Sequence, residues 1–335
     1  MTRPTVLTII LNYKTAPMTC RAAEAAVKAM NGIAGEIVIV DNDSGDGSFD
    51  EMTAFVADNG WTKDNRVRVL QSGRNGGFGA GNNVGIRAGL SNGQSPDYVY
   101  VQNSDAFPAP DAIHLLLDRL EATPAAGFAG SYIHGEEGDA HLTTFRFPSI
   151  ASEFESAIRF GPVTRLLGKR AVPVPTPAES CEVDWLAGAS LMMRQSVLNN
   201  IGVFDETFFL YFEETDLCRR AQMAGHKTLF VRESEVAHIG SVSTGMKSWR
   251  RVPGYWFDSR LHYFTKNHGA LYAAGATLAY FAGGALHRLR CFITRRETGD
   301  PPGFLWTMVS HDLSALIRAP FSSRKTATPA PMTGE

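Results

Sequence analysis

The sequence has few cysteines, and none of them lies close to another. Cys20, Cys181, Cys218 and Cys291 are scattered over 335 residues without a C-x-x-C pair. This spacing argues against a zinc ribbon and against a disulfide framework, and it is typical of a reducing compartment. The apolar run at residues 6–11 is too short for a signal peptide, and no small-residue cleavage site follows it. We therefore expect a cytoplasmic protein.

An overall excess of positive charge is also lacking. The 32 basic and 34 acidic side chains give a formal net charge of −2, which argues against nucleic acid as a partner. The charge is unevenly distributed, however. Residues 1–246 carry 20 basic and 29 acidic side chains, whereas residues 247–325 carry 12 basic and 4 acidic ones. This last part of the chain has a net charge of 12 − 4 = +8, so its electrostatic interactions are expected to differ from those of residues 1–246.

Two common nucleotide-binding motifs are absent. Neither G-x-G-x-x-G nor G-x-x-x-x-G-K-[ST] occurs anywhere in the chain, which argues against a dinucleotide-dependent dehydrogenase and against a P-loop kinase. A basic triphosphate-binding loop after the first expected strand is lacking too, because residues 12–16 read Asn-Tyr-Lys-Thr-Ala. This disfavours a sugar nucleotidyltransferase.

The first 135 residues alternate short β-rich runs with helical stretches, a pattern typical of a mostly parallel sheet covered by helices. Strands are expected at 6–11, 36–40, 67–71 and 98–102, and helices at 17–30, 50–58 and 112–120. Prolines make residues 136–180 look like an irregular insertion. Further helices are expected near 195–201 and 213–224, the second ending at Gly225 before a strand at 227–231.

These segments suggest a domain over residues 1–250, divided into a nucleotide-binding half (1–135) and an acceptor and catalytic half (180–250). A helical region at 251–321 and a disordered tail at 322–335 follow. Within the helical region, residues 269–286 are apolar, and Arg288, Arg290, Arg295 and Arg296 come next. This stretch is at the lower length limit for a membrane-spanning helix. A helix lying on an anionic membrane surface fits better, and a buried packing helix is the alternative.

Polar groups follow three of the expected strands, where ligands of open α/β sheets bind. Asp41 is placed to accept a hydrogen bond from the N3–H of a pyrimidine base, and the glycine-rich loop at 73–83 offers backbone N–H groups to a diphosphate. Asp105 ends another strand and suits a hard divalent cation. The alternatives are ordinary turn residues around both aspartates and glycines that only permit tight packing.

Carboxylates also gather after an aromatic run at residues 208–212. Glu213, Glu214 and Asp216 begin a helix, where one of them can act as a general base on a sugar hydroxyl. The alternative is helix electrostatics, with Asp216 paired to Arg219 or Arg220. His238 follows a later strand and can be a neutral ligand to the same cation or a structural histidine. The loop from His134 to His141 is expected to be solvated.

Five segments, in this order, resemble glycosyltransferase family two, the inverting nucleotide-sugar enzymes, and especially its rhamnosyltransferase-like members. The resemblance covers about residues 4–267. The segments are Asn12-Tyr13, Val40-Asp41-Asn42-Asp43-Ser44, Arg74-Asn75-Gly76-Gly77-Phe78-Gly79, Asn103-Ser104-Asp105, and Phe209-Leu210-Tyr211-Phe212-Glu213-Glu214-Thr215-Asp216 with His238 beyond.

The resemblance implies an α/β fold of the GT-A type, with a mixed, mostly parallel sheet flanked by helices, to which a C-terminal helical extension is added here. It implies a divalent metal, Mg²⁺ or Mn²⁺, held by Asp105 and His238, and Glu214 as the catalytic base. The residues implied to bind the nucleotide sugar are Asn12, Asp41, Asn42, Arg74, Asn75, Gly76, Gly77, Asn103 and Ser104. Those implied on the acceptor side are Trp185, Gly188 and Asp216.

Two departures from the family pattern bear on these roles. Asn103 stands where an aspartate is common, and Glu213-Glu214 replaces Glu followed by Asp. The extra methylene moves the carboxylate by about 1.5 Å, which leaves Glu213 as an alternative base.

The expected function is transfer of a sugar, rhamnose from dTDP-rhamnose or the sugar of another nucleoside-diphosphate donor, to a lipid-linked or polysaccharide acceptor in cell-envelope glycan synthesis. The expected location is the cytoplasmic face of the inner membrane, as a peripheral protein. The alternative is a catalytically degenerate carbohydrate-binding or scaffolding subunit, and a homo-oligomer stays open.

Overall fold

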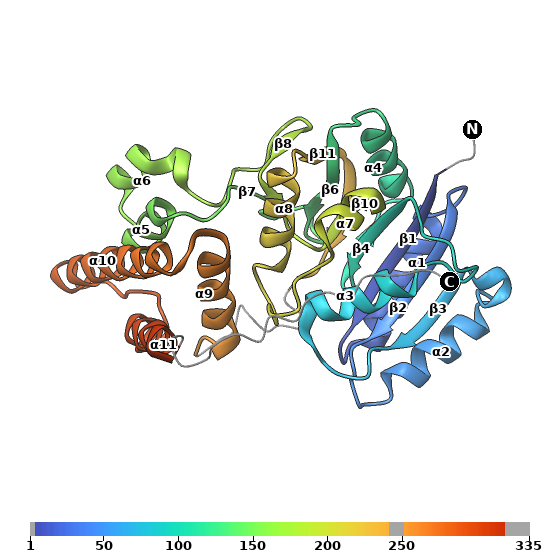
Figure 1. Cartoon of the computed structure of the whole chain (residues 1–335), viewed down its shortest axis with the longest axis horizontal. Helices are drawn as coiled ribbons and strands as arrows, with labels where there is room; N and C mark the ends of the chain where they lie inside the picture. The colour runs from blue at the N-terminus through green and yellow to red at the C-terminus, as the bar shows by residue number, and fades with distance from the viewer. Residues whose placement is uncertain (1–3, 241–250, 319–335) are drawn as a thin grey trace.

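The computed structural model describes residues 4–240 and 251–318, so the expected disordered tail at 322–335 lies outside the described residues. Within them, the centre of the molecule is a nine-stranded sheet in the order β3-β2-β1-β4-β10-β6-β11-β5, with β8 paired to β11 (Figure 1). The strands are β1 (Thr5–Asn12), β2 (Ala34–Asp41), β3 (Val67–Gln71), β4 (Tyr98–Asn103), β5 (Ala106–Pro108), β6 (Ala126–His134), β8 (Cys181–Val183), β10 (Ser190–Arg194) and β11 (Lys227–His238).

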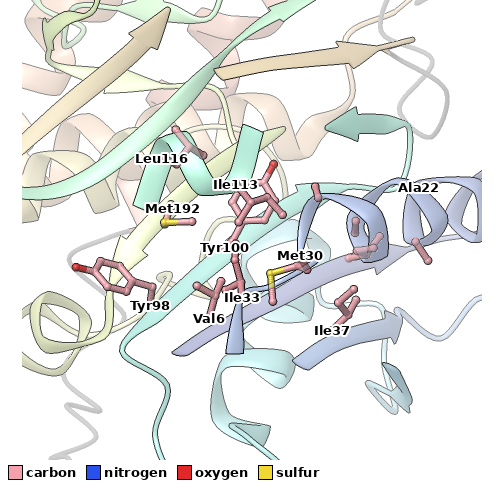
Figure 2. Close-up of a cluster of buried hydrophobic side chains, with 14 of the residues drawn as sticks. Val6, Ala22, Met30, Ile33, Ile37, Tyr98, Tyr100, Ile113, Leu116 and Met192 are labelled. Carbon is pink, nitrogen blue, oxygen red and sulfur yellow. The ribbon is translucent and has the colours of Figure 1, made fainter. Parts of the chain in front are cut away.

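Helices cover both faces of this sheet, as the alternating pattern predicts. They are α1 (Ala16–Ala29), α2 (Ser48–Asp58), α3 (Gly77–Ala88), α4 (Ala112–Glu121), α7 (Gln195–Ile201) and α8 (Glu213–Met223). Alternate residues of β1 enter different cores: Val6 and Ile10 pack with α1, α2 and α4, whereas Leu7 and Ile9 pack with α3, α7 and α8. Figure 2 shows the first of these cores. Burial on both faces explains why β1 is an almost continuous apolar run.

The strand directions bring six strand ends to one edge of the sheet. β1 is parallel to β2 and to β4, and β2 is parallel to β3. β10 is antiparallel to both β4 and β6, and β6 is parallel to β11. The expected mixed, mostly parallel sheet is therefore confirmed. The side chains that end the six parallel strands are Asn12, Asp41, Gln71, Asn103, His134 and His238.

A helical unit lies beside the sheet, on the left in Figure 1. It consists of α5 (Ile150–Ile158), α6 (Gly161–Leu167), α9 (Gly254–His268), α10 (Ala270–Thr294) and α11 (Phe304–Arg318). Its interior contains a charged network in which Arg260, 1% exposed, donates to Glu153 (2.8 Å) and to Asp312 (3.1 Å).

The expectation of an irregular insertion at residues 136–180 is wrong for part of that stretch, because α5 and α6 lie within it. Ser149 caps α5 by accepting a hydrogen bond from Ser152 N–H, and Pro162 occupies the first turn of α6, where proline is tolerated. The prolines therefore mark helix starts here rather than an absence of helix. Local sequence cannot reveal the partner of α5, which is α10, more than 100 residues further along the chain.

The apolar stretch at 269–286 forms most of α10, and one face of this helix packs inside the unit. Among the described residues, none of the helices combines the length and the apolar character needed to cross a bilayer. The packing alternative is thus correct for the inner face of α10, whereas its outer face carries exposed leucine and phenylalanine side chains.

Two short strands, β7 (Thr144–Phe145) and β9 (Trp185–Leu186), form a separate two-stranded sheet between the main sheet and the helical unit. Trp185 stacks on Phe145 with ring centroids 4.1 Å apart, and its indole N–H donates to the Arg146 carbonyl at 2.9 Å. This short sheet holds residues 187–189 next to the polar edge of the main sheet, since Ala187 N–H donates to the Thr143 carbonyl.

Candidate active site

A polar pocket closes around Asp41 at the ends of β1, β2 and β3. Asn12 Nδ2 donates to Asp41 Oδ1 at 2.8 Å, and Gln71 Nε2 donates to Asp41 Oδ2 at 2.9 Å. Ser44 donates twice, through its hydroxyl to Oδ1 and through its backbone N–H to Oδ2. Because a carboxylate offers about four acceptor positions, all of them are occupied by this chain.

This arrangement bears on the expected role of Asp41. The residue is 1% exposed, so its carboxylate binds together the strand ends and the 41–47 loop. Recognition of a pyrimidine base by Asp41 stays a prediction, and it requires one of the donors, Asn12, Ser44 or Gln71, to move away. Asn12 is itself held in place, because Thr19 donates to its Oδ1 at 2.8 Å.

The glycine-rich loop is fastened to this pocket and to the segment that precedes α8. Asn42 Nδ2 donates to Asn75 Oδ1 (3.0 Å) and to the Gly77 carbonyl (3.2 Å). Gly77 has φ +88°, and a Cβ there would lie 1.7 Å from the Phe209 carbonyl oxygen. Phe78 N–H donates to that same oxygen at 3.0 Å. Only glycine therefore allows this close approach of the two segments.

A second set of contacts ties α3 to the same segment. Asn83 bonds both backbone groups of Phe204 and the carboxylate of Glu206. Arg74 donates to Glu206 at 2.9 Å, and its side chain is 70% exposed at the mouth of the site. A Cβ on Gly76 would lie 2.7 Å from the Cβ of Ala80, so this glycine also serves close packing. Arg74 is left as an exposed cation beside backbone N–H groups, a combination that suits an anion.

Asp105, which follows β4, lies next to His238, the last residue of β11. This is the arrangement expected of two residues that hold the same cation. His238 Nε2 lies 3.0 Å from Asp105 Oδ1 and 3.3 Å from Asn103 Nδ2. Gly240 N–H donates to Asp105 Oδ2 at 3.1 Å. Burial raises the pKa of the Asp105 carboxyl, but the hydrogen bond and charge of His238 and backbone N–H groups outweigh burial and hold that pKa below its usual value.

The donor set at this point fits a divalent cation that is completed by phosphate oxygens. Asp105 supplies a carboxylate, His238 an imidazole and Asn103 an amide. Among residues 4–240 and 251–318, no group of three or more His, Cys, Asp or Glu side chains forms a closed metal cage. One or two protein ligands are enough for Mg²⁺ when substrate phosphates and water provide the rest. Metal binding by Asp105 and His238 stays a prediction.

His141 also lies at this cluster, although its loop was expected to be solvated. Its ring lies edge-on to that of His238, with centroids 5.9 Å apart, and its side chain is mostly enclosed. Glu136, Glu137 and Asp139 of the same loop are exposed. The expected solvated loop is therefore correct for the acidic residues and wrong for His141, because β6 carries the loop along the same sheet edge as β11.

A reversal of the backbone places Glu213 and Glu214 in the first turn of α8. Tyr211 and Phe212 both have left-handed conformations, with φ of 72° and 69°, each of which costs about 1–3 kcal/mol in a residue other than glycine. Within the described part of the chain, Glu213 Oε2 and Glu214 Oε2 are buried without a hydrogen-bond partner. Strain and unpaired carboxylate oxygens concentrated at one turn are typical of an active site.

The environment of the two glutamates favours their protonated forms. Burial, followed by the negative charge of Glu214, raises the pKa of Glu213 well above its ordinary value. Burial likewise raises the pKa of Glu214. A raised pKa makes a carboxylate a stronger base, as general base catalysis near neutral pH needs. Helix electrostatics alone would lower both pKa values, so burial is the larger effect here.

A short segment connects this pair to the Asp105 cluster. Gly188 N–H lies 3.4 Å from Glu214 Oε1, and the carbonyl of the next residue, Ala189, accepts a hydrogen bond from Asn103 N–H at 3.2 Å. A Cβ on Gly188 would lie 2.9 Å from the ring of Phe78, which belongs to the glycine-rich loop. Ser104, next to Asn103, accepts from Thr15 at 3.3 Å. The expected donor, base and acceptor segments are thus brought to one place.

Asp216 is the exception among the expected site residues. Its side chain is fully buried, and it accepts from Arg220 (2.8 Å), Lys266 (2.8 Å) and Asn267 (3.1 Å). The predicted alternative, an i,i+4 ion pair with Arg220, is confirmed. Three donors from α8 and α9 enclose this carboxylate, so the structure does not present it to an acceptor as the sequence analysis expected.

Three further residues at the site were missed from the sequence: Gln71, Asn83 and Glu206. Gln71 is a polar residue at the end of an expected strand, so its position was a usable signal. Asn83 and Glu206 gave no such signal, because their contact joins positions 123 residues apart.

Comparisons with known proteins agree with this geometry. A family model described as glycosyl transferase family 2 matches residues 7–181. An N-acetylglucosaminyl-diphospho-decaprenol L-rhamnosyltransferase of Mycobacterium tuberculosis is 31% identical over 216 residues, which are 58% of this chain and 68% of the relative. Rhamnosyltransferase WbbL of Escherichia coli is 26% identical over 165 residues, 48% of this chain and 60% of that relative. The resemblance expected from the five segments is confirmed.

Solved structures of similar fold include Staphylococcus aureus TarS 1–349 in complex with UDP-GlcNAc, with a TM-score of 0.54, 13% identity and coverage of 94% of this chain and 81% of that one. Mannosyltransferase PcManGT from Pyrobaculum calidifontis, in complex with GDP-Man and Mn²⁺, has a TM-score of 0.51, 14% identity and coverage of 97% and 89%. These likenesses concern the fold, and they confirm the expected GT-A type.

Proposed function

The chain belongs to glycosyl transferase family 2 and is a glycosyltransferase, and we propose that it transfers rhamnose from dTDP-rhamnose, with inversion at the anomeric carbon, to a lipid-linked acceptor. This proposal has two variants. The donor can be another nucleoside-diphosphate sugar, and the acceptor can be a polysaccharide. The names of two relatives support it, since both are rhamnosyltransferases and one acts on a diphospho-decaprenol. The product would enter cell-envelope glycan synthesis.

The observation that carries the proposal is the link from Glu214 through residues 188–189 to Asn103. It connects a carboxylate whose pKa is raised by burial to the end of β4, two residues before Asp105. Glu214 takes the proton of the acceptor hydroxyl while that oxygen forms a bond to the anomeric carbon. The bond from this carbon to the diphosphate oxygen breaks at the same time, and the nucleoside diphosphate leaves with the electron pair. Attack opposite to the leaving group inverts the carbon.

The donor would lie along the polar edge of the sheet. Backbone N–H groups of the glycine-rich loop and the exposed guanidinium of Arg74 suit its diphosphate. The polar cluster at Asn12, Asp41 and Asn42 would take the base once one of the donors to Asp41 moves away. Gly188, whose N–H lies 3.4 Å from Glu214 Oε1, and Trp185 of the neighbouring strand β9 are assigned to the acceptor side in this proposal.

Asp105 and His238, with Asn103 beside them, would hold Mg²⁺ or Mn²⁺. Such a cation, when bound, neutralises charge on the departing diphosphate. The likeness to a Mn²⁺ complex of the same fold supports this choice. A lipid-linked acceptor would also place the protein at the cytoplasmic face of the inner membrane, as a peripheral protein.

The test is a transfer assay with Mn²⁺ and a polyprenyl-diphosphate acceptor carrying N-acetylglucosamine, given dTDP-rhamnose or UDP-N-acetylglucosamine as donor. We expect transfer from dTDP-rhamnose, and we expect the anomeric configuration of the product, read by NMR, to be opposite to that of the donor. A retained configuration would contradict the single displacement.

Nucleotide binding without turnover on any acceptor would favour the alternative, a degenerate carbohydrate-binding or scaffolding subunit. Two departures from the family pattern, at Asn103 and Glu214, motivate this alternative. Slow hydrolysis of a nucleotide sugar that is lost in Glu214→Ala would count against it.

A further inference from the structure

The helix α10 carries small side chains on its inner face. Buried residues on this face are Ala273, Ala276, Thr277, Gly283, Gly284, His287 and Cys291. A Cβ on Gly283 would lie 2.7 Å from the Phe154 carbonyl of α5, and a Cβ on Gly284 would lie 2.7 Å from Leu305 of α11. The helix is therefore packed tightly between α5 and α11 through its smallest residues (Figure 1).

The outer face of α10 carries the large apolar side chains. The exposed ones are Leu271, Leu278, Phe281, Leu286, Leu289, Phe292 and Ile293. Leu271 is 92% exposed and Phe292 83%. Positions 271, 278, 282, 285, 289 and 293, all exposed, recur at intervals of three, four or seven and so share one side of the helix. A surface helix of a globular protein normally has the opposite arrangement, with its large apolar residues inside.

The charged side chains of α10 itself all have one sign, because residues 270–294 contain no aspartate or glutamate. Arg288 and Arg290 lie at the two margins of the apolar stripe, at 100° per residue on either side of Leu289. Both also contact the chain itself: Arg288 lies 3.9 Å from Asp300, and Arg290 donates to the Arg159 carbonyl at 2.7 Å. Arg295 and Arg296 come directly after the helix and are exposed. An apolar stripe with arginines along its margin complements a surface that is negatively charged outside and apolar beneath.

We propose that the outer face of α10, from Leu271 to Ile293, docks this protein on an anionic lipid bilayer with the helix lying flat. The stripe is about 33 Å long at 1.5 Å per residue. Its leucine and phenylalanine side chains enter the boundary between head groups and acyl chains, and the exposed Arg295 and Arg296 meet lipid phosphates. A flat orientation also agrees with the absence, in the part of the chain that the structure describes, of a helix able to span a membrane.

This surface is separate from the polar sheet edge and goes beyond the transfer reaction. Ion pairs fix the helical unit relative to the catalytic half. Lys266 of α9 donates to Asp205 and to Asp216, both at 2.8 Å. His262 of the same helix lies 3.0 Å from Asp205. The docked unit would therefore hold the site at a constant height above the lipid.

The test is co-sedimentation of the full chain with vesicles of phosphatidylglycerol and phosphatidylethanolamine, compared with vesicles of phosphatidylcholine alone. We expect binding to the anionic vesicles that weakens at high salt. Phe292→Glu should weaken it about tenfold, and the double variant Leu289→Glu, Phe292→Glu should weaken it further, because each places a negative charge in the apolar stripe.

The matched control is Met223→Glu, which changes a side chain that is 74% exposed on α8 and should leave vesicle binding unchanged. Equal melting temperatures would show that all variants are folded. Transfer to a water-soluble acceptor should proceed at the unaltered rate in Phe292→Glu, so failure of the docking proposal can be told apart from failure of the proposed reaction.

Three results would overturn the proposal. The unaltered protein could fail to bind anionic vesicles at low salt, or Phe292→Glu could bind them as well as the unaltered protein does. Sedimentation velocity could also show a dimer that Phe292→Glu converts to a monomer without a change in vesicle binding, in which case the stripe is an interface between two copies of this chain.

Discussion

The sheet and the helical unit of this molecule differ in where their large apolar side chains lie. The strands β1, β2 and β4 bury almost every large apolar side chain and leave polar groups at their ends. The helix α10 buries glycine and alanine and leaves leucine and phenylalanine exposed. We therefore assign the proposed substrate chemistry to the first region and the proposed attachment to the second. The difference indicates that activity and location can be altered separately.

The first prediction tests this separation with the largest effect. Glu214→Gln should lower the turnover of sugar transfer by about 10²–10⁴-fold, because the base is lost while the shape is kept. Nucleotide affinity and vesicle binding should stay unchanged. Steady-state kinetics measure the turnover, calorimetry measures the nucleotide affinity, and co-sedimentation measures the vesicle binding.

The matched control is Glu137→Gln, on an exposed part of the 134–141 loop, which should transfer sugar at the unaltered rate. Full activity in Glu214→Gln together with inactivity in Glu213→Gln would move the base to Glu213.

The second prediction weakens the helical unit alone. Arg260→Met leaves the buried carboxylates of Glu153 and Asp312 without their cation, which should cost about 3–5 kcal/mol of unfolding free energy in that unit. Urea denaturation measures it. Arg165→Met, at an exposed position of α6, should cost little. Loss of nucleotide binding at a temperature where the sheet is still folded would show that the two regions are not separable.

The third prediction concerns the contact between the glycine-rich loop and the segment before α8. Gly77→Ala should lower stability by about 1–3 kcal/mol and reduce turnover, because its Cβ would collide with the Phe209 carbonyl at a positive φ. Gly73→Ala has a similar φ, +73°, but its Cβ would meet nothing within 4 Å. An equally large loss of turnover in Gly73→Ala would show that the collision is irrelevant.

The fourth prediction concerns pH. The pKa of Glu213 is raised in the folded state, so its contribution to stability is present below its ordinary pKa of 4.5 and is lost as pH rises through the folded value. The unfolding free energy should fall over this window by up to about 1.4 kcal/mol per pH unit. Glu213→Gln should show a shallower fall in thermal melts across pH 4.5–8. A slope as steep as that of the unaltered protein would contradict the raised pKa.

The predictable parts of the fold are those that local sequence determines. The strands at Val67–Gln71 and Tyr98–Asn103 are apolar runs, and the pair Asp216–Arg220 follows from helical spacing. Such features need only the period of the chain. The approach of Asp105 to His238 was expected from the family resemblance, which implies that both hold the same cation, and not from local periodicity.

The unpredicted parts depend on contacts between distant residues. α5 is held by α10, and His141 is brought to His238 by the register of β6 with β11. The outer face of α10 is a further case. Its hydrophobic sequence fits either a packed or an exposed helix, and only the positions of α5 and α11 decide which side is covered.

The most direct test of the central claim is a calorimetric titration of the full chain with dTDP and with UDP, each with and without Mn²⁺, repeated with Asp105→Ala. The account predicts binding of a nucleotide that depends on Mn²⁺ and is lost in Asp105→Ala, and the preferred nucleotide identifies the base of the donor. Absence of binding of both nucleotides under every condition, in a protein that melts cooperatively, would contradict a donor site at the polar edge of the sheet.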